Sequence, residues 1–284
     1  MNSFKPTYKY SSKHPVGIYV SVDAGELANF DVRLLNLGDI KAPSKPIDVL
    51  AVMFDLEGFT NFARQVDPQL TVPTFLSDFL EWLFASIKSQ LTMSERVAKN
   101  RKIAVAEAKS LLWAELPFFS KFMGDGVLFL WRIDLDKIIG IDPSRPADKL
   151  QYEIQEFLCN IIASMYDVCA EYKQFVKTVE TQHVDPPPIL RCGIARGTAI
   201  PIGNGSDFVG PCINIAARLQ KFNGITFTFS ARGIDRAGFS GQYQDKFFKK
   251  RASVRGIGEN ELVYVLNDEY EALEDELKSR FSDP

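Results

Sequence analysis

The sequence predicts a domain of mixed α and β structure in which strands and helices alternate around one central sheet. Three observations lead to this fold class. A continuous apolar run, IDVLAVMF at residues 47–54, ends in turn residues, as expected of a strand buried on both faces. Apolar side chains recur at helical spacing over 72–87 and over 147–176. FFSKFMGDGVLFLW, residues 118–131, is typical of two strands joined by a tight Gly-Asp-Gly turn. An α/β or α+β sandwich follows.

Residues 1–46 precede this regular pattern. They alternate polar, Lys- and Pro-bearing stretches with short segments such as GIYVSV and FDVRLLNL. A separate domain of this length would be marginally stable, so we expect an N-terminal extension packed on a main domain at 47–284. Within that domain, the charged, Ala-rich residues 92–115 open with a capping-box pattern and predict a helical insert.

The second half of the chain continues the alternation. ILRCGIARGTAI, residues 189–200, predicts a strand, and PCINIAARLQKFNG, residues 211–224, predicts a short helix that stops at Asn223-Gly224. ITFTFS and ELVYVL predict further strands, and an acidic helix closes the chain.

Composition narrows the possible functions. With 284 residues, 46% of them hydrophobic, the chain can bury a substantial core. The net charge of −3 provides no basic field to draw the protein to nucleic acid or anionic lipid. The apolar runs are shorter than the roughly 20 residues that cross a bilayer, and no signal peptide opens the sequence. We therefore expect a cytoplasmic protein without membrane or nucleic-acid partners, whose four cysteines are reduced.

Two absences exclude common routes to catalysis. Only two histidines occur, His14 and His183, and both lie in polar or Pro-rich stretches. They leave little for a Ser-His-Asp triad or a histidine-based zinc site. Neither G-x-x-x-x-G-K-S/T nor G-x-G-x-x-G is present, which excludes the P-loop and the dinucleotide fingerprint.

Two carboxylates stand where buried strands end. Asp55 closes the strand at 47–54, and Asp125 lies at the tip of the hairpin. Each has a structural alternative, because Asp55 could cap a helix beginning near Gly58 and Asp125 could be a plain turn residue. Side by side on adjacent strands, the two acids would repel each other unless a hard cation lay between them. Two Mg²⁺ or Mn²⁺ ions there would polarise an attacking oxygen and stabilise a leaving phosphate, which outlines a phosphoryl-transfer site.

Four motifs, in order over residues 47–230, resemble those of the class III nucleotidyl cyclases. FDLEGFT is similar to the family's opening F-x-D-I/L-x-G-F-S/T, KFMGD to its K-x-x-G-D hairpin, LRCGIARG to its R-x-G-I-x-x-G strand, and DFVGPCINIAAR to its D-x-x-G-x-x-x-N-x-A-x-R segment. VRGIGENELVYVL resembles the family's last strands. The resemblance implies a ferredoxin-like α+β catalytic domain, with a mostly antiparallel sheet flanked by helices. It also implies a homodimer that pairs head to tail and shares its active sites across the interface.

The resemblance assigns metal and phosphate roles to one group of residues. Asp55 and Asp125, with the backbone of Leu56, would bind two Mg²⁺ or Mn²⁺ ions. The residues that would contact the triphosphate are Gly58, Phe59, Thr60 and, in place of a lysine that many members have where Ile257 stands here, Arg255. The reaction would be attack of the ribose 3′-oxygen on the α-phosphorus, giving a 3′,5′-cyclic nucleotide and pyrophosphate. Such an enzyme is a phosphorus–oxygen lyase whose catalysis is mostly positioning and charge stabilisation.

A second group would come from the partner chain. Lys121 and Asp207 would contact the base, Asn214 the ribose and Arg218 the phosphates. Asn214 and Arg218 are four residues apart and share one helix face, so both can reach one nucleotide. The segment between GIARG and GPCIN is shorter than usual, which reshapes the hairpin beside Asp207.

The base remains open between two interpretations. Lys121 and Asp207 are the pair that reads adenine in many family members, which favours an adenylate cyclase acting on ATP. The short chain, the hairpin, the insert and the compact base-side loop resemble instead the stand-alone bacterial pyrimidine cyclases of the Pycsar antiphage type. Their cyclic UMP or cyclic CMP activates a separate effector protein. We favour UTP over CTP, and a pyrimidine over ATP, although fold-level analogy does not determine a substrate.

Two rival classes are less well supported by the sequence. A diguanylate-cyclase or polymerase-palm relative would share the ferredoxin-like core and the two metals, but its G-G-D/E-D/E-F signature is absent. An inactive nucleotide-binding regulator would lack a metal-binding acid or the Asn214–Arg218 pair, and all four residues are present.

Overall fold

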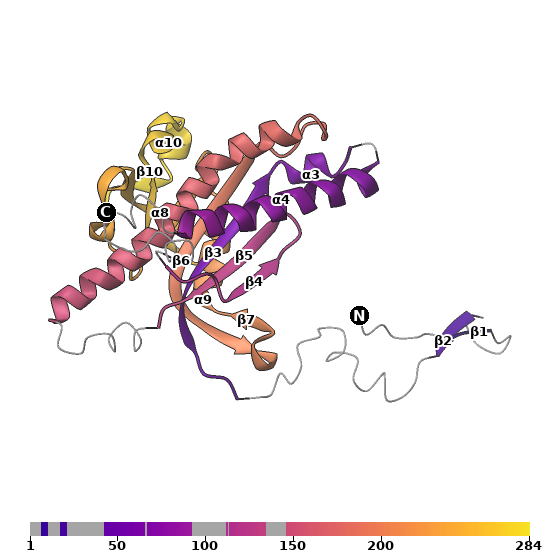
Figure 1. Cartoon of the computed structure of the whole chain (residues 1–284), viewed down its shortest axis with the longest axis horizontal. Helices are drawn as coiled ribbons and strands as arrows, with labels where there is room; N and C mark the ends of the chain where they lie inside the picture. The colour runs from indigo at the N-terminus through magenta and orange to yellow at the C-terminus, as the bar shows by residue number, and fades with distance from the viewer. Residues whose placement is uncertain are drawn as a thin grey trace, which may run out of the picture. The chain divides into compact units, whose positions relative to one another are not determined.

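The computed structural model describes residues 7–10, 18–21, 43–65, 67–92, 112, 114–134 and 146–284 (Figure 1). The chain divides into two compact units. The smaller consists of Met1–Ile47 and Ala199–Gly210, and the larger of Asp48–Thr198 and Pro211–Pro284.

The larger unit begins with a β-α-β-β-α-β succession. Its elements are β3 (Ile47–Glu57), α4 (Pro68–Leu91), β4 (Phe119–Phe122), β5 (Gly126–Arg132), α8 (Ala147–Val179) and β6 (Ile189–Ile202). The strands lie in the order β6-β3-β5-β4, which is the ferredoxin-like arrangement. The expected α+β fold is therefore confirmed.

The sheet continues beyond β6 in the order β8, β10, β9 and β11. The remaining elements are the strands β8 (Phe227–Ser230), β9 (Phe247–Val254), β10 (Gly258–Leu266) and β11 (Phe281–Ser282), the helices α3 (Phe59–Phe62), α9 (Pro211–Leu219), α10 (Asn267–Ala272) and α11 (Asp275–Lys278), and the 3₁₀ turns η1 (Gly203–Gly205), η2 (Arg236–Gly238) and η3 (Gly241–Tyr243). The β6–β8 pair is parallel, whereas β3–β5, β4–β5, β8–β10, β9–β10 and β9–β11 are antiparallel. The closing acidic segment forms two short helices rather than one.

The smaller unit contains two strand pairs. β1 (Thr7–Tyr10) pairs antiparallel with β2 (Ile18–Ser21), and the end of β6 pairs antiparallel with β7 (Asp207–Val209). The predicted packing of residues 1–46 on the main domain, and most of the predicted helix at 92–115, lie outside the described residues. Of that insert the structure describes Thr92 and Leu112, which form a single β-bridge, and Ala114 and Glu115, which are not helical.

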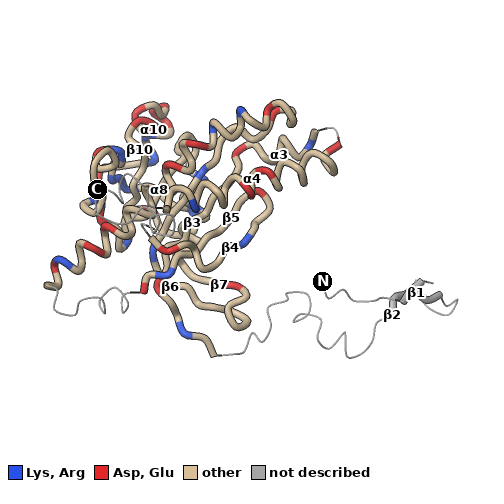
Figure 2. The backbone as a smooth tube through the Cα atoms, viewed as in Figure 1, with Lys and Arg blue, Asp and Glu red and all other residues tan. Residues whose placement is uncertain are grey.

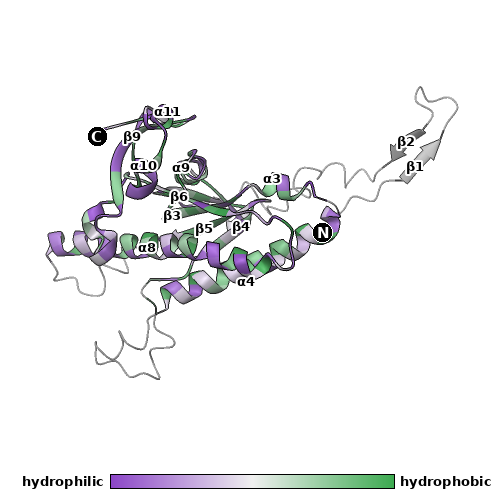
Figure 3. Cartoon of the chain, turned by 90° about the horizontal axis from the view of Figure 1, so that it is seen from above, coloured by the Kyte–Doolittle hydropathy of each residue, from purple (hydrophilic) through white to green (hydrophobic). Residues whose placement is uncertain are grey.

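Side chains of the central strands alternate between two faces of the sheet. On β3, Leu50, Val52, Phe54 and Leu56 enter the core shared with α4 and α8. Because successive strand residues point to opposite faces, Asp55 is directed to the other side, where α9 lies (Figure 3). The active-site candidates and the main core are thereby separated by the sheet.

Helix α4 packs on α8 through aromatic rings. Trp82 and Phe175 stack at 5.0 Å, and Phe79 meets Tyr172 edge-on at 6.1 Å between centroids. Among the described residues α4 is the one helix whose length and composition would let it cross a membrane, which corrects the expectation that every apolar stretch is too short. This is weak evidence for a span, since the core helices of soluble proteins pass the same test.

Charged residues of both signs are interspersed over the described elements (Figure 2). This mixing agrees with the small net charge of −3.

Candidate active site

Asp55 and Asp125 come together at the ends of adjacent strands. β3 and β5 pair with Asp55 opposite Gly126, and the Leu56 N–H donates to the Asp125 carbonyl oxygen at 2.9 Å. A Cβ on Gly126 would lie 2.3 Å from the Phe54 carbonyl oxygen, so only glycine permits this close approach of the two backbones. Both acids line the same two cavities. The α9 cavity also contacts Asn214 and Arg218 of α9, and the turn cavity also contacts the Gly58–Thr60 turn.

The helix-cap alternative for Asp55 is wrong. The helix that follows, α3, is a single turn whose N-cap is Gly58 at φ 88°, and no side chain caps it. The alternative interpretation of Asp125 as a turn residue is correct, but the turn also places it at the cavities. The Met123 N–H donates to the Gly126 carbonyl oxygen at 2.8 Å, closing a hairpin turn in which Gly124 has φ 91°. The same turn directs Asp125 to the cavities.

Arg191 is a site residue to which the sequence analysis assigned no role. Its Nη2 lies 2.5 Å from Asp55 Oδ2, and its Nε lies 3.9 Å from Glu57 Oε2. The side chains of Asp55 and Arg191 are 8% and 17% exposed, so this ion pair is largely withdrawn from water. The sequence does contain an indication of this role. Arg191 lies inside the otherwise apolar strand LRCGIA, and a charged side chain buried there requires a partner.

The α9 cavity has a volume of about 420 Å³. It brings Asn214 and Arg218 to the same space as Asp55 and Asp125 within one chain. The opposite face of α9 is anchored by buried Ile215, Ala216 and Leu219, so Asn214 and Arg218, one turn apart, are presented outward. A Cβ on Gly193 would lie 2.1 Å from the Ala216 carbonyl oxygen, so this glycine lets α9 approach β6 closely.

The turn cavity, of about 390 Å³, also has both acids in its lining. It is lined by Leu56, Gly58, Phe59, Thr60 and Asn61, and also by Arg191, Lys221 and Asn223. The expected triphosphate-contacting turn therefore adjoins both acids. Helix α3 has only four residues, so its dipole is small. An anion in the turn cavity would be bound by main-chain N–H groups of the turn.

Lys221 is a second residue that the sequence analysis missed. It lines both cavities and follows Arg218 by three positions. Its ammonium has no hydrogen bond or ion pair with another described side chain. The spacing of three residues between Arg218 and Lys221 could have indicated from the sequence that the two side chains lie close together.

The remaining predicted residues, Lys121, Asp207 and Arg255, line neither of the two cavities. Lys121 is exposed on the edge strand β4. Asp207 begins β7, which belongs to the smaller unit. Arg255 is exposed in the turn between β9 and β10, where Gly256 and Ile257, not Arg255, line the α9 cavity.

Comparison with known proteins gives structural neighbours only. No protein-family model and no curated protein matches the sequence significantly. Two structures of a bacterial light-regulated adenylyl cyclase resemble the chain, at 14% and 17% identity and TM-scores of 0.48 and 0.47; each comparison covers 85% of this chain and 58% of that one. A third is the catalytic core of a rhodopsin-guanylyl cyclase with converted specificity in complex with ATPαS, at 16% identity and a TM-score of 0.42, covering 79% of this chain and 98% of that one.

These neighbours are adenylyl and guanylyl cyclases, the class of enzyme that the sequence motifs resemble. The chain spans 58% of the length of the two light-regulated structures. Identities this low carry no information about substrate or reaction, so a function has to be argued from the site.

The donor set fits a hard divalent cation. Two carboxylates with main-chain carbonyl groups beside them are oxygen ligands of the kind that Mg²⁺ and Mn²⁺ prefer. Among the described residues no group of three or more His, Cys, Asp or Glu side chains could hold a metal. A cation at Asp55 and Asp125 would therefore take its other ligands from water and phosphate, as Mg²⁺ commonly does.

Proposed function

We propose that the chain is a nucleotidyl cyclase that converts a nucleoside triphosphate into a 3′,5′-cyclic nucleotide and pyrophosphate. The observation that supports this most directly is the convergence of Asp55, Asp125, Asn214 and Arg218 on one cavity. These residues come from three separate motifs of the sequence. A turn with free space for an anion adjoins the same two acids.

Asp55 and Asp125 would hold two divalent cations, which when bound supply Lewis-acid stabilisation of the phosphate charge. The Gly58–Thr60 turn would contact the triphosphate through main-chain N–H groups. Arg191 and Lys221 would offset the negative charge of the phosphates, and Lys221 is a nearby cation where Ile257 replaces the usual lysine. Arg191 also holds Asp55 in place, because one oxygen of that carboxylate accepts from its guanidinium.

In the reaction the bond from the ribose O3′ to the α-phosphorus forms and the bond from the α-phosphorus to the bridging oxygen of pyrophosphate breaks. The 3′-hydroxyl proton passes to solvent water during this step. Asn214 would orient the ribose and Arg218 the phosphates for in-line attack, so the protein contributes positioning and charge rather than a covalent intermediate. We also propose a homodimer. The shared cavity favours Asn214 and Arg218 acting with the two acids of their own chain, whereas the family resemblance implies that they act on the acids of the partner chain, and mixing of inactive variants distinguishes the two.

We further propose a pyrimidine substrate, UTP before CTP, and a cyclic product that acts on a separate effector in antiphage defence. Support for this part comes from the overall resemblance of the sequence alone. Lys121 and Asp207 favour the alternative, ATP, if they reach the base together.

A competition assay tests both levels of the proposal. Purified protein receives equal ATP, GTP, CTP and UTP with Mn²⁺, and cyclic products are quantified by mass spectrometry, with Asp125→Asn as the inactive control. Dominant cyclic UMP is expected. Dominant cyclic AMP would overturn the pyrimidine preference while supporting the cyclase. No cyclic product from any of the four, in protein shown to be folded, would contradict the cyclase itself.

A further inference from the structure

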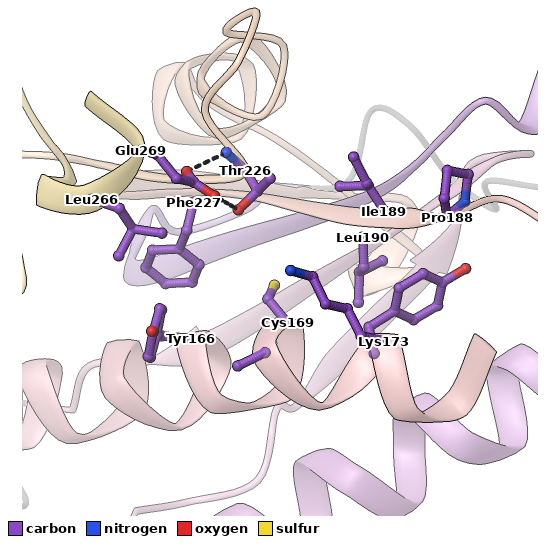
Figure 4. Close-up of a pocket in the computed structure, with 12 residues that line it drawn as sticks. Tyr166, Cys169, Lys173, Pro188, Ile189, Leu190, Thr226, Phe227, Leu266 and Glu269 are labelled. Carbon is purple, nitrogen blue, oxygen red and sulfur yellow. Dashed lines mark hydrogen bonds between the residues drawn. The ribbon is translucent and has the colours of Figure 1, made fainter. Parts of the chain in front are cut away.

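A cavity of about 410 Å³ lies between α8 and the sheet, on the face opposite the candidate active site (Figure 4). Cys192 on β6 belongs to the core facing α8, and the neighbouring Gly193 faces α9, so the two sides of the sheet are distinct here. The volume lies in the range of small-molecule sites. Its apolar wall includes Tyr166, Leu190, Phe227 and Leu266.

Most polar groups around this cavity already have partners. Both Glu269 carboxylate oxygens accept from Thr226, one from its N–H at 2.7 Å and one from its hydroxyl at 2.5 Å. The Tyr172 hydroxyl donates to the Pro187 carbonyl oxygen at 2.8 Å, and the Tyr166 hydroxyl accepts from Lys246 at 3.3 Å. These groups are satisfied by the protein and need nothing from a ligand.

Lys173 is the exception. Its side chain lines the cavity and, with Cys169, rises from α8 towards the strands (Figure 4). Among the residues that the structure describes, its ammonium has neither a hydrogen bond nor an ion pair. Lys173 is an exposed residue, so its ammonium also meets solvent. A mostly apolar cavity with a cation at its solvent side favours a ligand with an apolar body and a negative end.

We propose that this cavity is a binding site for a small amphipathic organic acid. Its apolar body lies against Phe227, Leu190 and Leu266, and its carboxylate or other anionic group meets Lys173. The Glu269 charge is held by Thr226 and stays out of this contact.

Residues that line the cavity are adjacent in the chain to residues of the candidate active site, so a ligand bound here would regulate that site. The regulation rests on the proposed function, whereas binding of the ligand to the cavity does not. Leu190 lines the cavity, and the next residue, Arg191, crosses to the other face and pairs with Asp55. Thr226 lies shortly after α9, which presents Asn214 and Arg218. A ligand that shifts β6 or the start of β8 would move these groups.

Calorimetric titration with three probes of equal chain length tests the charge and the shape of the site. Octanoate is expected to bind more tightly than octanol or octylammonium. Lys173→Gln should weaken octanoate at least about threefold, the scale of a partly exposed ion pair, while Lys177→Gln one turn further along α8 should leave it unchanged. Ala170→Leu, which fills the cavity from an exposed helix position, should weaken octanoate and octanol alike.

Protection of Cys169 from alkylation gives a second, local readout. Cys159, Cys192 and Cys212 are buried, and burial raises the pKa of the Cys192 thiol, so labelling of the folded protein reports Cys169. Octanoate should slow this labelling in the wild type and not in Ala170→Leu. Equal binding of the three probes, equal effects of Lys173→Gln and Lys177→Gln, or unprotected Cys169 at saturating octanoate would overturn the proposal. None of these readouts depends on cyclase activity.

Discussion

Asp55 and Asp125 differ in what surrounds them, although both are candidate metal ligands. The Asp55 carboxylate is buried and pairs with Arg191, whereas the Asp125 carboxylate has no side-chain partner among the described residues. Two neighbouring carboxylates repel each other when no cation is bound, so removal of one of them would by itself favour the folded state. The ion pair to Arg191 changes that expectation. Asp55→Ala would leave the mostly buried Arg191 guanidinium with only the 3.9 Å contact to Glu57 among the described residues.

We expect Asp55→Ala to lower the free energy of unfolding by about 3 kcal/mol, and Asp125→Ala to leave it nearly unchanged. Both should reduce cyclase turnover at least about 100-fold, since each removes a proposed metal ligand. Denaturant unfolding of the two variants measures the first effect, and product formation measures the second. Equal stability of the two variants would contradict the structural importance of the Arg191 pair. Adding Arg191→Met to Asp55→Ala should recover part of the lost stability.

Among the elements, α8 is linked to the η3 turn by a partly buried hydrogen bond. The Tyr243 hydroxyl donates to Asp167 Oδ2 at 2.5 Å. Burial raises the pKa of the Asp167 carboxyl above 3.8, and the hydrogen bond from Tyr243 partly opposes this by stabilising the charged form. An acid whose pKa is raised by folding lowers stability as the pH rises through that pKa.

Tyr243→Phe should therefore destabilise the protein in a pH-dependent way. Loss of the donor raises the pKa of Asp167 further, so the deficit relative to wild type is expected to be small below about pH 3.8 and to reach about 1.5 kcal/mol at pH 7. Thermal or denaturant unfolding across this range measures it, with exposed Tyr152→Phe on the same helix as the matched control. A deficit of equal size at both ends of the range would rule out the proposed charge coupling.

At the scale of the whole molecule, the open question is which chain completes each site. One chain already brings the two acids and the α9 pair to a single cavity, and Asn214 and Arg218 are exposed there. The family resemblance predicts instead that the partner chain contributes them. The two arrangements differ in which residues must belong to the same polypeptide.

Mixing of two inactive variants decides between them. Asp125→Asn chains lack a metal ligand, and Arg218→Ala chains lack the phosphate contact. If sites are shared across a homodimer interface, mixed dimers contain one intact site and part of the activity returns. Activity that stays absent, in chains shown by size-exclusion or labelling to exchange, would mean that each chain supplies both halves of its own site.

Much of the fold could be predicted from the sequence, because the spacing of apolar residues in a strand or helix is a local property of the chain. The apolar run of β3, the helical spacing of α4 and α8, and the Gly-Asp-Gly turn between β4 and β5 each depend on neighbours a few residues away. The structure confirms all of them, with α4 starting at Pro68 and α8 ending at Val179. The prediction of a single helix for the acidic C-terminal segment was wrong, because the helix ends before Leu273, whose side chain is buried.

Local sequence patterns were enough to predict the succession of strands and helices and the positions of Asp55 and Asp125 at strand ends. The packing of the folded chain was needed to show that Arg191 pairs with Asp55, that Lys221 lines both cavities, and that Asp55 caps no helix. These outcomes depend on which strands are neighbours and on which face of the sheet each residue points to. Pairing between segments more than 100 residues apart leaves no local pattern in the chain, because it is set by how the layers pack together.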